Sequence, residues 1–291
     1  MSQSTAASST EAATTDTETG ASETADGETP ADVDTTDLLT LDAPQYLQMS
    51  GEVQLFDQIF SAVGTVTDKA RLGIGDSGIA IRAADRQGHA MVDLRVAGSS
   101  FSSFDAATGT LGVDVGRVRD ALSIGNAGDL AQFALDAANS TLEIDIDGIA
   151  RTIELDAIES LRYPVEMPDI DLPATVHLSP DDMSLGLSAA DMLGDRFDLT
   201  VDSEAGEMRF VASGDTDDMT YRRAKTDLIA FEPADVEINL DSSLVKSANA
   251  GLPDGTNRVL HIGDGVPLVL KSEFPDADGA MQFVIAPKLP N

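Results

Sequence analysis

The 291-residue sequence contains no cysteine and no tryptophan, and only 18 of its residues are lysine or arginine. The absence of cysteine excludes disulfides, thiolate metal sites and thiol nucleophiles together. Aromatic residues make up 4% of the chain, so aliphatic side chains, within a hydrophobic fraction of 42%, must fill the core. No apolar run approaches the roughly 20 residues that span a membrane, and the N-terminus lacks the basic and apolar regions of a secretory signal. We therefore expect a soluble cytoplasmic protein with no membrane partner.

Acidic residues number 51, which gives the chain a formal net charge of −33. Such a balance argues against nucleic-acid binding, because affinity for phosphate depends on lysine and arginine. A second interpretation is adaptation to molar salt, where dense carboxylate surfaces stay hydrated and repel one another. At about 1 M salt the Debye length is about 3 Å, so long-range repulsion from DNA is largely screened. The scarcity of lysine and the many small side chains favour salt adaptation.

Residues 1–43 consist mainly of threonine, serine, alanine and acidic residues, and the first basic residue of the chain is Lys69. A segment with so few large apolar residues cannot offset its ordering entropy, so we predict that residues 1–43 are disordered. The segment is either a solubilising tail or the product of a misassigned start codon, or else an acidic tether that binds a basic partner or mimics DNA. The composition favours the first interpretation over the tether.

The first half of the remaining chain combines two short helices with many strands. Leu55, Phe56, Ile59, Phe60 and Val63 recur at helical spacing, which predicts an amphipathic helix from about Glu52. A second helix is expected from Asp114. Alternating patterns predict the strands, which lie within Lys69–Val96, Leu130–Leu135 and Thr141–Leu155.

The second half repeats this order. Ser179-Pro180-Asp181-Asp182 is typical of a helix start, with serine as N-cap, proline in the first turn and acids at the positive end of the helix dipole. A last helix is expected from Asp241 to about Gly251. The predicted C-terminal strands are Arg258–Ile262, Val266–Lys271 and Met281–Ile285. We predict an α+β protein with two pseudo-equivalent domains, 44–155 and 174–291, and an extended connector at 156–173.

Two short motifs resemble ligand sites, but their context favours turns. Gly73 to Gly78 matches G-x-G-x-x-G, yet an alternating strand follows where a phosphate-binding helix would be required. Asp145-Ile146-Asp147-Gly148 begins like a calcium loop but lacks the remaining ligands. The three histidines stand singly, and no nucleophile motif accompanies them. We expect no catalytic residue, no metal and no cofactor.

A series of short strings, taken in order and spacing, resembles the PCNA-type sliding clamps of archaea, particularly those of salt-loving species. The resemblance covers residues 45 to 291. The strings are Ile81-Arg82-Ala83-Ala84-Asp85, Met91-Val92-Asp93-Leu94, Asn126-Ala127-Gly128-Asp129-Leu130, Ile146-Asp147-Gly148, Pro168-Asp169-Ile170-Asp171-Leu172-Pro173-Ala174, Ala189-Ala190-Asp191-Met192, Gly214-Asp215-Thr216-Asp217-Asp218, Val266-Pro267-Leu268-Val269-Leu270 and Ala286-Pro287-Lys288.

The resemblance implies a homotrimeric ring whose helices line a central hole around double-stranded DNA, associated with the nucleoid. Subunits would join head-to-tail by pairing sheet edges, here near Thr152–Leu155 and Glu207–Ala212. The ring would be loaded by a clamp loader, and it would tether DNA polymerase, a flap nuclease and ligase as a processivity factor in replication and repair. The alternative is a clamp-like paralogue that acts as a scaffold or competitor for clamp-binding peptides, with weak or no DNA encirclement.

The resemblance also implies two sets of site residues. Partner peptides would bind a pocket beneath the connector, although His89 stands where the family usually has valine. The matching positions are Ala84, His89, Leu161, Tyr163, Pro164, Pro267, Val284, Ala286 and Pro287. Leu161, Tyr163, Pro267 and Val284 could form one apolar recess. The DNA-facing residues would be Arg117, Arg119 and Lys246, fewer cations than the family carries on its inner helices.

Overall fold

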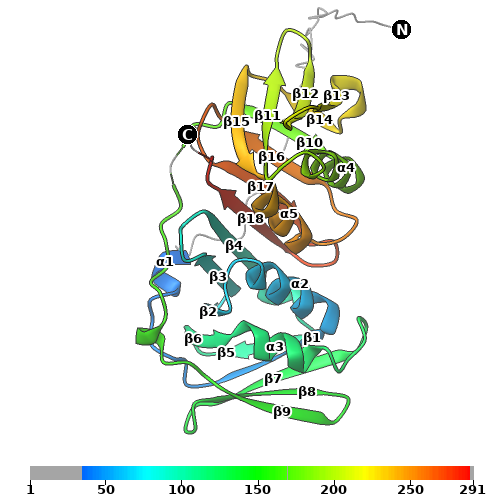
Figure 1. The fold of residues 1–291 in the computed structure, drawn as a ribbon. Helices are drawn as coiled ribbons and strands as arrows, with labels where there is room; N and C mark the ends of the chain where they lie inside the picture. The colour runs from blue at the N-terminus through cyan, green and yellow to red at the C-terminus, as the bar shows by residue number, and fades with distance from the viewer. Residues whose placement is uncertain (1–34, 169, 289–291) are drawn as a thin grey trace, which may run out of the picture. The chain divides into compact units, whose positions relative to one another are not determined.

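The computed structural model describes residues 35–168 and 170–288, and within these ranges it contains five α-helices (Figure 1). They are α1 (Thr35–Leu38), α2 (Val53–Gly64), α3 (Val115–Leu122), α4 (Pro180–Asp191) and α5 (Ser242–Gly251). The four longer helices contact one another in a row, with α2 between α3 and α5, and α5 against α4. All four belong to helices that the sequence predicted.

Short polar side chains set where three of these helices begin. The Asp114 carboxylate accepts a hydrogen bond from the Arg117 main-chain N–H at 3.0 Å, and the Ser179 hydroxyl accepts one from Asp182 at 3.1 Å. Asp241 caps α5 in the same way. Each bond satisfies a donor that the first helical turn leaves without a partner. The predicted helix starts at Asp114, Ser179 and Asp241 are therefore confirmed.

The described strands form three antiparallel sheets. The first sheet has the order β5 (Ser103–Ala106), β1 (Leu47–Glu52), β7 (Leu130–Asp136), β8 (Thr141–Ile146) and β9 (Ile149–Glu154). The central sheet has the order β14 (Ala230–Glu232), β10 (Ala174–Leu178), β16 (Arg258–Ile262), β17 (Leu268–Glu273), β18 (Gly279–Ile285), β4 (Ala90–Ala97), β3 (Gly78–Ala84), β2 (Lys69–Gly75) and β6 (Gly109–Asp114). The third sheet has the order β13 (Asp218–Ala224), β12 (Glu207–Ser213), β11 (Arg196–Asp202) and β15 (Val236–Asp241).

The central sheet joins the two predicted halves of the chain, because β18 of the second half pairs with β4 of the first. Side chains alternate between the two faces of a strand, so neighbouring residues on β4 and β18 have different surroundings. Val92 and Phe283 belong to the large core that includes the helices, whereas Met91 and Val284 form a small separate cluster. The sheet thus has a helix-covered face and a second face, which we call the outer face.

Residues 35–43, which we predicted to be part of a disordered tail, are ordered. Leu38 and Leu39 are buried, and the glycines of β2 make this possible. A Cβ on Gly73 would lie 2.9 Å from the Leu38 side chain, too close for any other residue. An apolar pair that fits a glycine-lined surface therefore overrides the polar composition around it. Residues 1–34 lie outside the described part of the chain.

Both glycine-containing motifs form hairpin turns, as predicted. Gly75 and Gly78 close the turn between β2 and β3, and Gly78 has a φ of 139° that disfavours any side chain. Asp147 and Gly148, both with positive φ, form the two-residue turn between β8 and β9. Neither turn opens a helix, so neither has the geometry of a phosphate or calcium loop.

Candidate functional site

A row of small apolar side chains crosses the outer face of the central sheet. Ala84 pairs with Met91, Met91 with Val284, and Val284 with Val269, so the four residues lie side by side on β3, β4, β18 and β17. Met91 and Val284 are only 6% and 7% exposed, although they lie outside the large core that the four longer helices cover. The cover comes from the connector, whose Met167, Ile170 and Leu172 pack against the row.

Three more of the predicted pocket residues gather at the end of these strands. The Ala286 main-chain N–H donates to the His89 carbonyl at 2.8 Å. The register of β17 with β18 places Pro267 opposite Ala286. Because His89, Pro267 and Ala286 are two residues from Met91, Val269 and Val284, they share the outer face with the apolar row. Half-buried Pro287 follows Ala286.

The beginning of the connector lies elsewhere, beside β2 and β6. Leu161 is buried there against Gly112 of β6. A Cβ on Gly112 would lie 3.0 Å from the Leu161 side chain, so glycine leaves the room that this side chain occupies. Tyr163 is 75% exposed, and its ring lies 4.8 Å from the guanidinium carbon of Arg71. Pro164 is half-buried. The structure therefore groups Ala84, His89, Pro267, Val284 and Ala286, but it places Leu161 and Tyr163 apart from Pro267 and Val284.

Arg71, which we did not single out in the sequence, anchors the beginning of the connector. Its side chain is nearly buried, and it donates to the main-chain carbonyls of Ile158 at 2.8 Å, Arg162 at 2.9 Å and Leu161 at 3.3 Å. It also donates to the carbonyl of Leu39 at 3.1 Å. One guanidinium thus fastens both the connector and the segment after α1 to the central sheet. A lone arginine within an apolar strand is the only signal that the sequence offers for this role.

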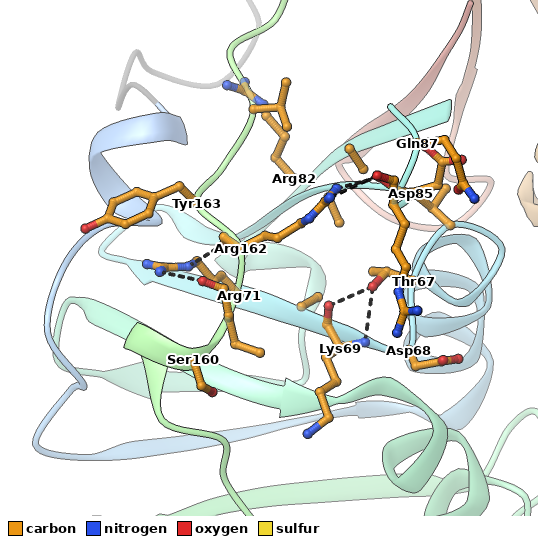
Figure 2. Close-up of a pocket in the computed structure, with 17 residues that line it drawn as sticks. Thr67, Asp68, Lys69, Arg71, Arg82, Asp85, Gln87, Ser160, Arg162 and Tyr163 are labelled. Carbon is orange, nitrogen blue, oxygen red and sulfur yellow. Dashed lines mark hydrogen bonds between the residues drawn. The ribbon is translucent and has the colours of Figure 1, made fainter. Parts of the chain in front are cut away.

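A recess of about 540 Å³ lies between the connector and the outer face at β2 and β3. Figure 2 shows Lys69, Arg71, Arg82 and Arg162 around it, together with Tyr163. Ala84, Leu161 and Tyr163 also line the recess, so three predicted pocket residues belong to this cavity. Basic side chains outnumber acidic ones in the recess, a feature that the sequence did not suggest.

The predicted DNA-facing cations lie on exposed parts of α3 and α5. Arg117 and Arg119 are exposed on α3, and Arg117 forms a loose ion pair of 3.8 Å with Asp114. Half-buried Lys246 on α5 binds Asp191 of α4 at 2.6 Å. The four-helix row carries more acids than cations. Its acidic residues are Asp57, Asp120, Asp181, Asp182 and Asp191.

Two of the edge strands, β9 and β13, bear on the predicted subunit contacts, and one of them corrects a prediction. β9 is an edge of the first sheet, which agrees with the expected contact near Thr152–Leu155. We expected the second contact at Glu207–Ala212, but this segment is β12, which β11 and β13 flank on both sides. Its hydrogen-bonding groups are already used within the sheet. The edge strand that pairs with β12 is β13, and β15 is the opposite edge of the same sheet; the strand order shows this, whereas local sequence does not.

An ion-paired network joins β13 to the beginning of α4. Asp182 accepts hydrogen bonds from Arg223 and from the Tyr221 hydroxyl, the latter at 3.1 Å. Burial of the phenol and its bond to Asp182 raise the pKa of Tyr221 to about 12. Although burial opposes it, the bond from Arg223 keeps the pKa of the Asp182 carboxyl below its usual value. The network fixes the edge strand against the helix.

Within residues 35–168 and 170–288, no group of three or more histidine, aspartate or glutamate side chains is placed to hold a metal ion. The same part of the chain contains no helix that is both long and apolar enough to cross a membrane.

The chain resembles known proteins along most of its length, although no family model matches it. A DNA polymerase sliding clamp of Halobacterium salinarum is 32% identical over 232 residues, which is 80% of this chain and 94% of the relative. The PCNA of A. fulgidus, solved with the C-terminal region of FEN-1, superposes with a TM-score of 0.79 at 22% identity, covering 84% of this chain and 99% of that chain. The PCNA2–PCNA3 complex of Sulfolobus tokodaii gives a TM-score of 0.71 at 19% identity, covering 83% and 99%. These superpositions confirm the predicted α+β clamp fold.

Proposed function

Because this chain belongs to the DNA polymerase sliding clamp family, we propose that three copies close into a ring around double-stranded DNA and hold replication proteins on it. The observation that carries this proposal is the row of helices α3, α2, α5 and α4, combined with the open edge strands β9 and β13. The row gives the ring a helical inner surface. The two edges, one in each half, provide the contacts for closure.

Head-to-tail pairing of β9 from one copy with β13 of the next satisfies main-chain groups that would otherwise stay open. A heterologous contact of this kind closes into a ring when the rotation between copies is threefold. Apolar surface supports the assignment, because Ile149 on β9 is 54% exposed in the single chain. The Asp182 network, which fixes β13, prepares the partner edge for the same contact.

The inner surface of such a ring does not attract DNA strongly. Arg117, Arg119 and Lys246 are outnumbered by the five acids of the four-helix row, most of which lie on α4, and Lys246 already pairs with Asp191. Retention of DNA therefore depends on closure of the ring. In about 1 M salt the Debye length is about 3 Å, so the salt screens most of the repulsion between the acidic helices and the more distant phosphates.

The outer face is the proposed partner site. The apolar row of Met91, Val269 and Val284 would accept the apolar side chains of a partner peptide once Met167, Ile170 and Leu172 of the connector move aside. A solved relative has the C-terminal region of FEN-1 bound, which supports a flap nuclease as one partner. DNA polymerase, ligase and the clamp loader would use the same site. The role is non-catalytic, needs no cofactor, and is exercised in the cytoplasm at the nucleoid.

The test is loader-dependent stimulation of the cognate DNA polymerase on primed circular DNA in concentrated potassium salt. We expect the wild-type protein to increase product length, whereas the triple variant Arg117→Glu, Arg119→Glu, Lys246→Glu stimulates less but binds partner peptide normally. A matched control reverses charges away from the helices, at Arg95, Lys225 and Lys271. Absence of any stimulation with intact peptide binding would contradict the ring proposal, and equal effects of both triple variants would contradict the DNA-facing assignment.

A further inference from the structure

The recess beneath the connector concentrates positive charge on a strongly acidic protein. Five of the 18 basic residues of the chain line it, against two carboxylates. The cations are Lys69, Arg71, Arg82, Arg86 and Arg162, and the acids are Asp68 and Asp85. A chain with a net charge of −33 has few cations to place, so their gathering in one cavity requires a physical explanation.

Internal ion pairs account for only part of this charge. Lys69 pairs with Asp156, and Arg82 pairs with Asp93 at 3.0 Å. Even when these two partners are added, the cations outnumber the carboxylates. Asp85 is also occupied, because its carboxylate accepts the main-chain N–H groups of His89 at 2.7 Å and Ala90 at 3.3 Å.

The other three cations lack a carboxylate partner within the described residues. Arg71 and Arg162 donate only to main-chain carbonyls, with Arg162 holding the carbonyls of Asp85 at 2.7 Å and Arg86 at 2.9 Å. The Arg86 side chain is exposed and forms no ion pair there. Carbonyl dipoles satisfy donors but do not cancel a charge. Arg71 and Arg162 therefore keep the recess positive, and Arg86 and half-exposed Lys69 remain accessible to a ligand.

The recess is continuous with the proposed partner site. Ala84 lines the recess, and it also packs with Met91 and Val284 in the apolar row. A peptide whose apolar anchors occupy the row would therefore extend one of its flanks past Ala84 toward Arg86 and Lys69. Tyr163, stacked on Arg71, forms the outer wall of this path.

We propose that the recess binds an acidic flank of the partner peptides, so that this clamp selects partners carrying aspartate or glutamate beside their apolar anchor. The proposal rests on the proposed function and adds a charge preference to it. Carboxylates would bond to Arg86 and Lys69 within the field of Arg71 and Arg162. Such contacts are charge-assisted hydrogen bonds at short range, so about 1 M salt weakens them far less than interactions across distances greater than about 3 Å.

The test uses synthetic peptides of the FEN-1 C-terminal region from the same genome, labelled with a fluorophore and titrated in about 1 M KCl. Three versions keep the apolar anchor and carry acidic, neutral amide or lysine residues on both flanks. We expect the acidic version to bind about tenfold more tightly than the neutral one, which corresponds to about 1.4 kcal/mol. The double variant Lys69→Gln, Arg86→Gln should remove this difference. Lys225→Gln, an exposed lysine outside both the recess and the central sheet, is the matched control and should preserve it.

The outcomes separate the two proposals. If every peptide binds equally well to the wild type, the recess has no charge preference and the inference is wrong, while the clamp function stands. If no peptide binds at all, the partner site on the outer face is misassigned, and the acidic-flank inference falls with it. If the double variant instead weakens retention on DNA and leaves peptide discrimination intact, the recess contacts nucleic acid and the acidic-flank inference is overturned.

Discussion

Replacement of Arg71 by methionine tests whether one buried guanidinium fastens the connector. The substitution removes four hydrogen bonds to main-chain carbonyls, and two of these bonds, to Leu39 and Leu161, are buried. A buried acceptor left without a partner costs about 1–3 kcal/mol, whereas the carbonyls of Ile158 and Arg162 can turn to water. A methionine side chain at this position would also avoid the desolvation cost of a buried charge. We therefore expect a cost in the lower part of this range for each of the two buried carbonyls, which lowers the stability of the ordered connector by about 2–4 kcal/mol in total.

The loss should be local to the connector, and limited trypsin digestion can detect it there. Arg162 is the cleavage site, and in the wild type its guanidinium and its carbonyl are both held. If cleavage follows local opening, a cost of about 2 kcal/mol accelerates it about 30-fold at fixed protein concentration. Arg95→Met is the control, because Arg95 on β4 forms no ion pair within the described residues. Equal cleavage of the two variants would refute the anchoring role, and Arg71→Lys should be intermediate because lysine cannot reproduce the planar set of donors.

Three further changes test other parts of the structure. Gly112→Ala should lower the free energy of unfolding in urea by at least about 2 kcal/mol, because the new Cβ would lie 2.2 Å from the Asp156 carbonyl oxygen. Gly128→Ala, whose Cβ would meet nothing within 4 Å, should be neutral. Similar urea midpoints for the two variants would contradict this account. Ile149→Asp on β9 should weaken trimer formation at least about tenfold in sedimentation experiments, whereas Ile229→Asp, with the same 54% exposure, should not; a trimer insensitive to the first change would exclude β9 as the contact. The pKa of Tyr221 is raised to about 12, so the folded state favours the neutral phenol, and the stability that this group contributes is lost as the pH rises from about 10 to about 12. Spectrophotometric titration should show a phenolate step near pH 12 that Tyr221→Phe lacks. A wild-type curve without that step would contradict the network.

The sequence predicted those elements whose causes are local. Helix starts follow from capping side chains such as Asp114 and Ser179, and both were placed correctly because the capping bond spans only three residues. Hairpin turns followed from glycine and from strand alternation for the same reason. The fold and the family came from short strings distributed along the chain, which depend on no single position.

The missed features depend on contacts between distant residues. Neither Leu38 nor Leu39 has a periodic neighbour that predicts burial, and their place depends on Gly73, which lies more than thirty residues away. The error at β12 has the same origin, since only the order of strands in the third sheet shows that β13 is outermost. We suggested that Leu161 could share an apolar recess with Pro267; the bonds from Arg71, which sequence does not reveal, hold the beginning of the connector beside β6.

The placement of the few cations separates two kinds of electrostatic interaction in this protein. On α3 and α5 the cations are exposed or paired with acids, as Lys246 is with Asp191, so in the proposed ring they would offer DNA little net attraction. In the recess, Arg71 and Arg162 are held by carbonyls and stay uncompensated. Screening by salt weakens interactions over long distances far more than contacts within about 3 Å. For the proposed ring, concentrated salt should therefore relieve the repulsion from DNA more than it weakens short contacts in the recess, which would allow the same acidic chain to slide on DNA and still discriminate among partner peptides by charge.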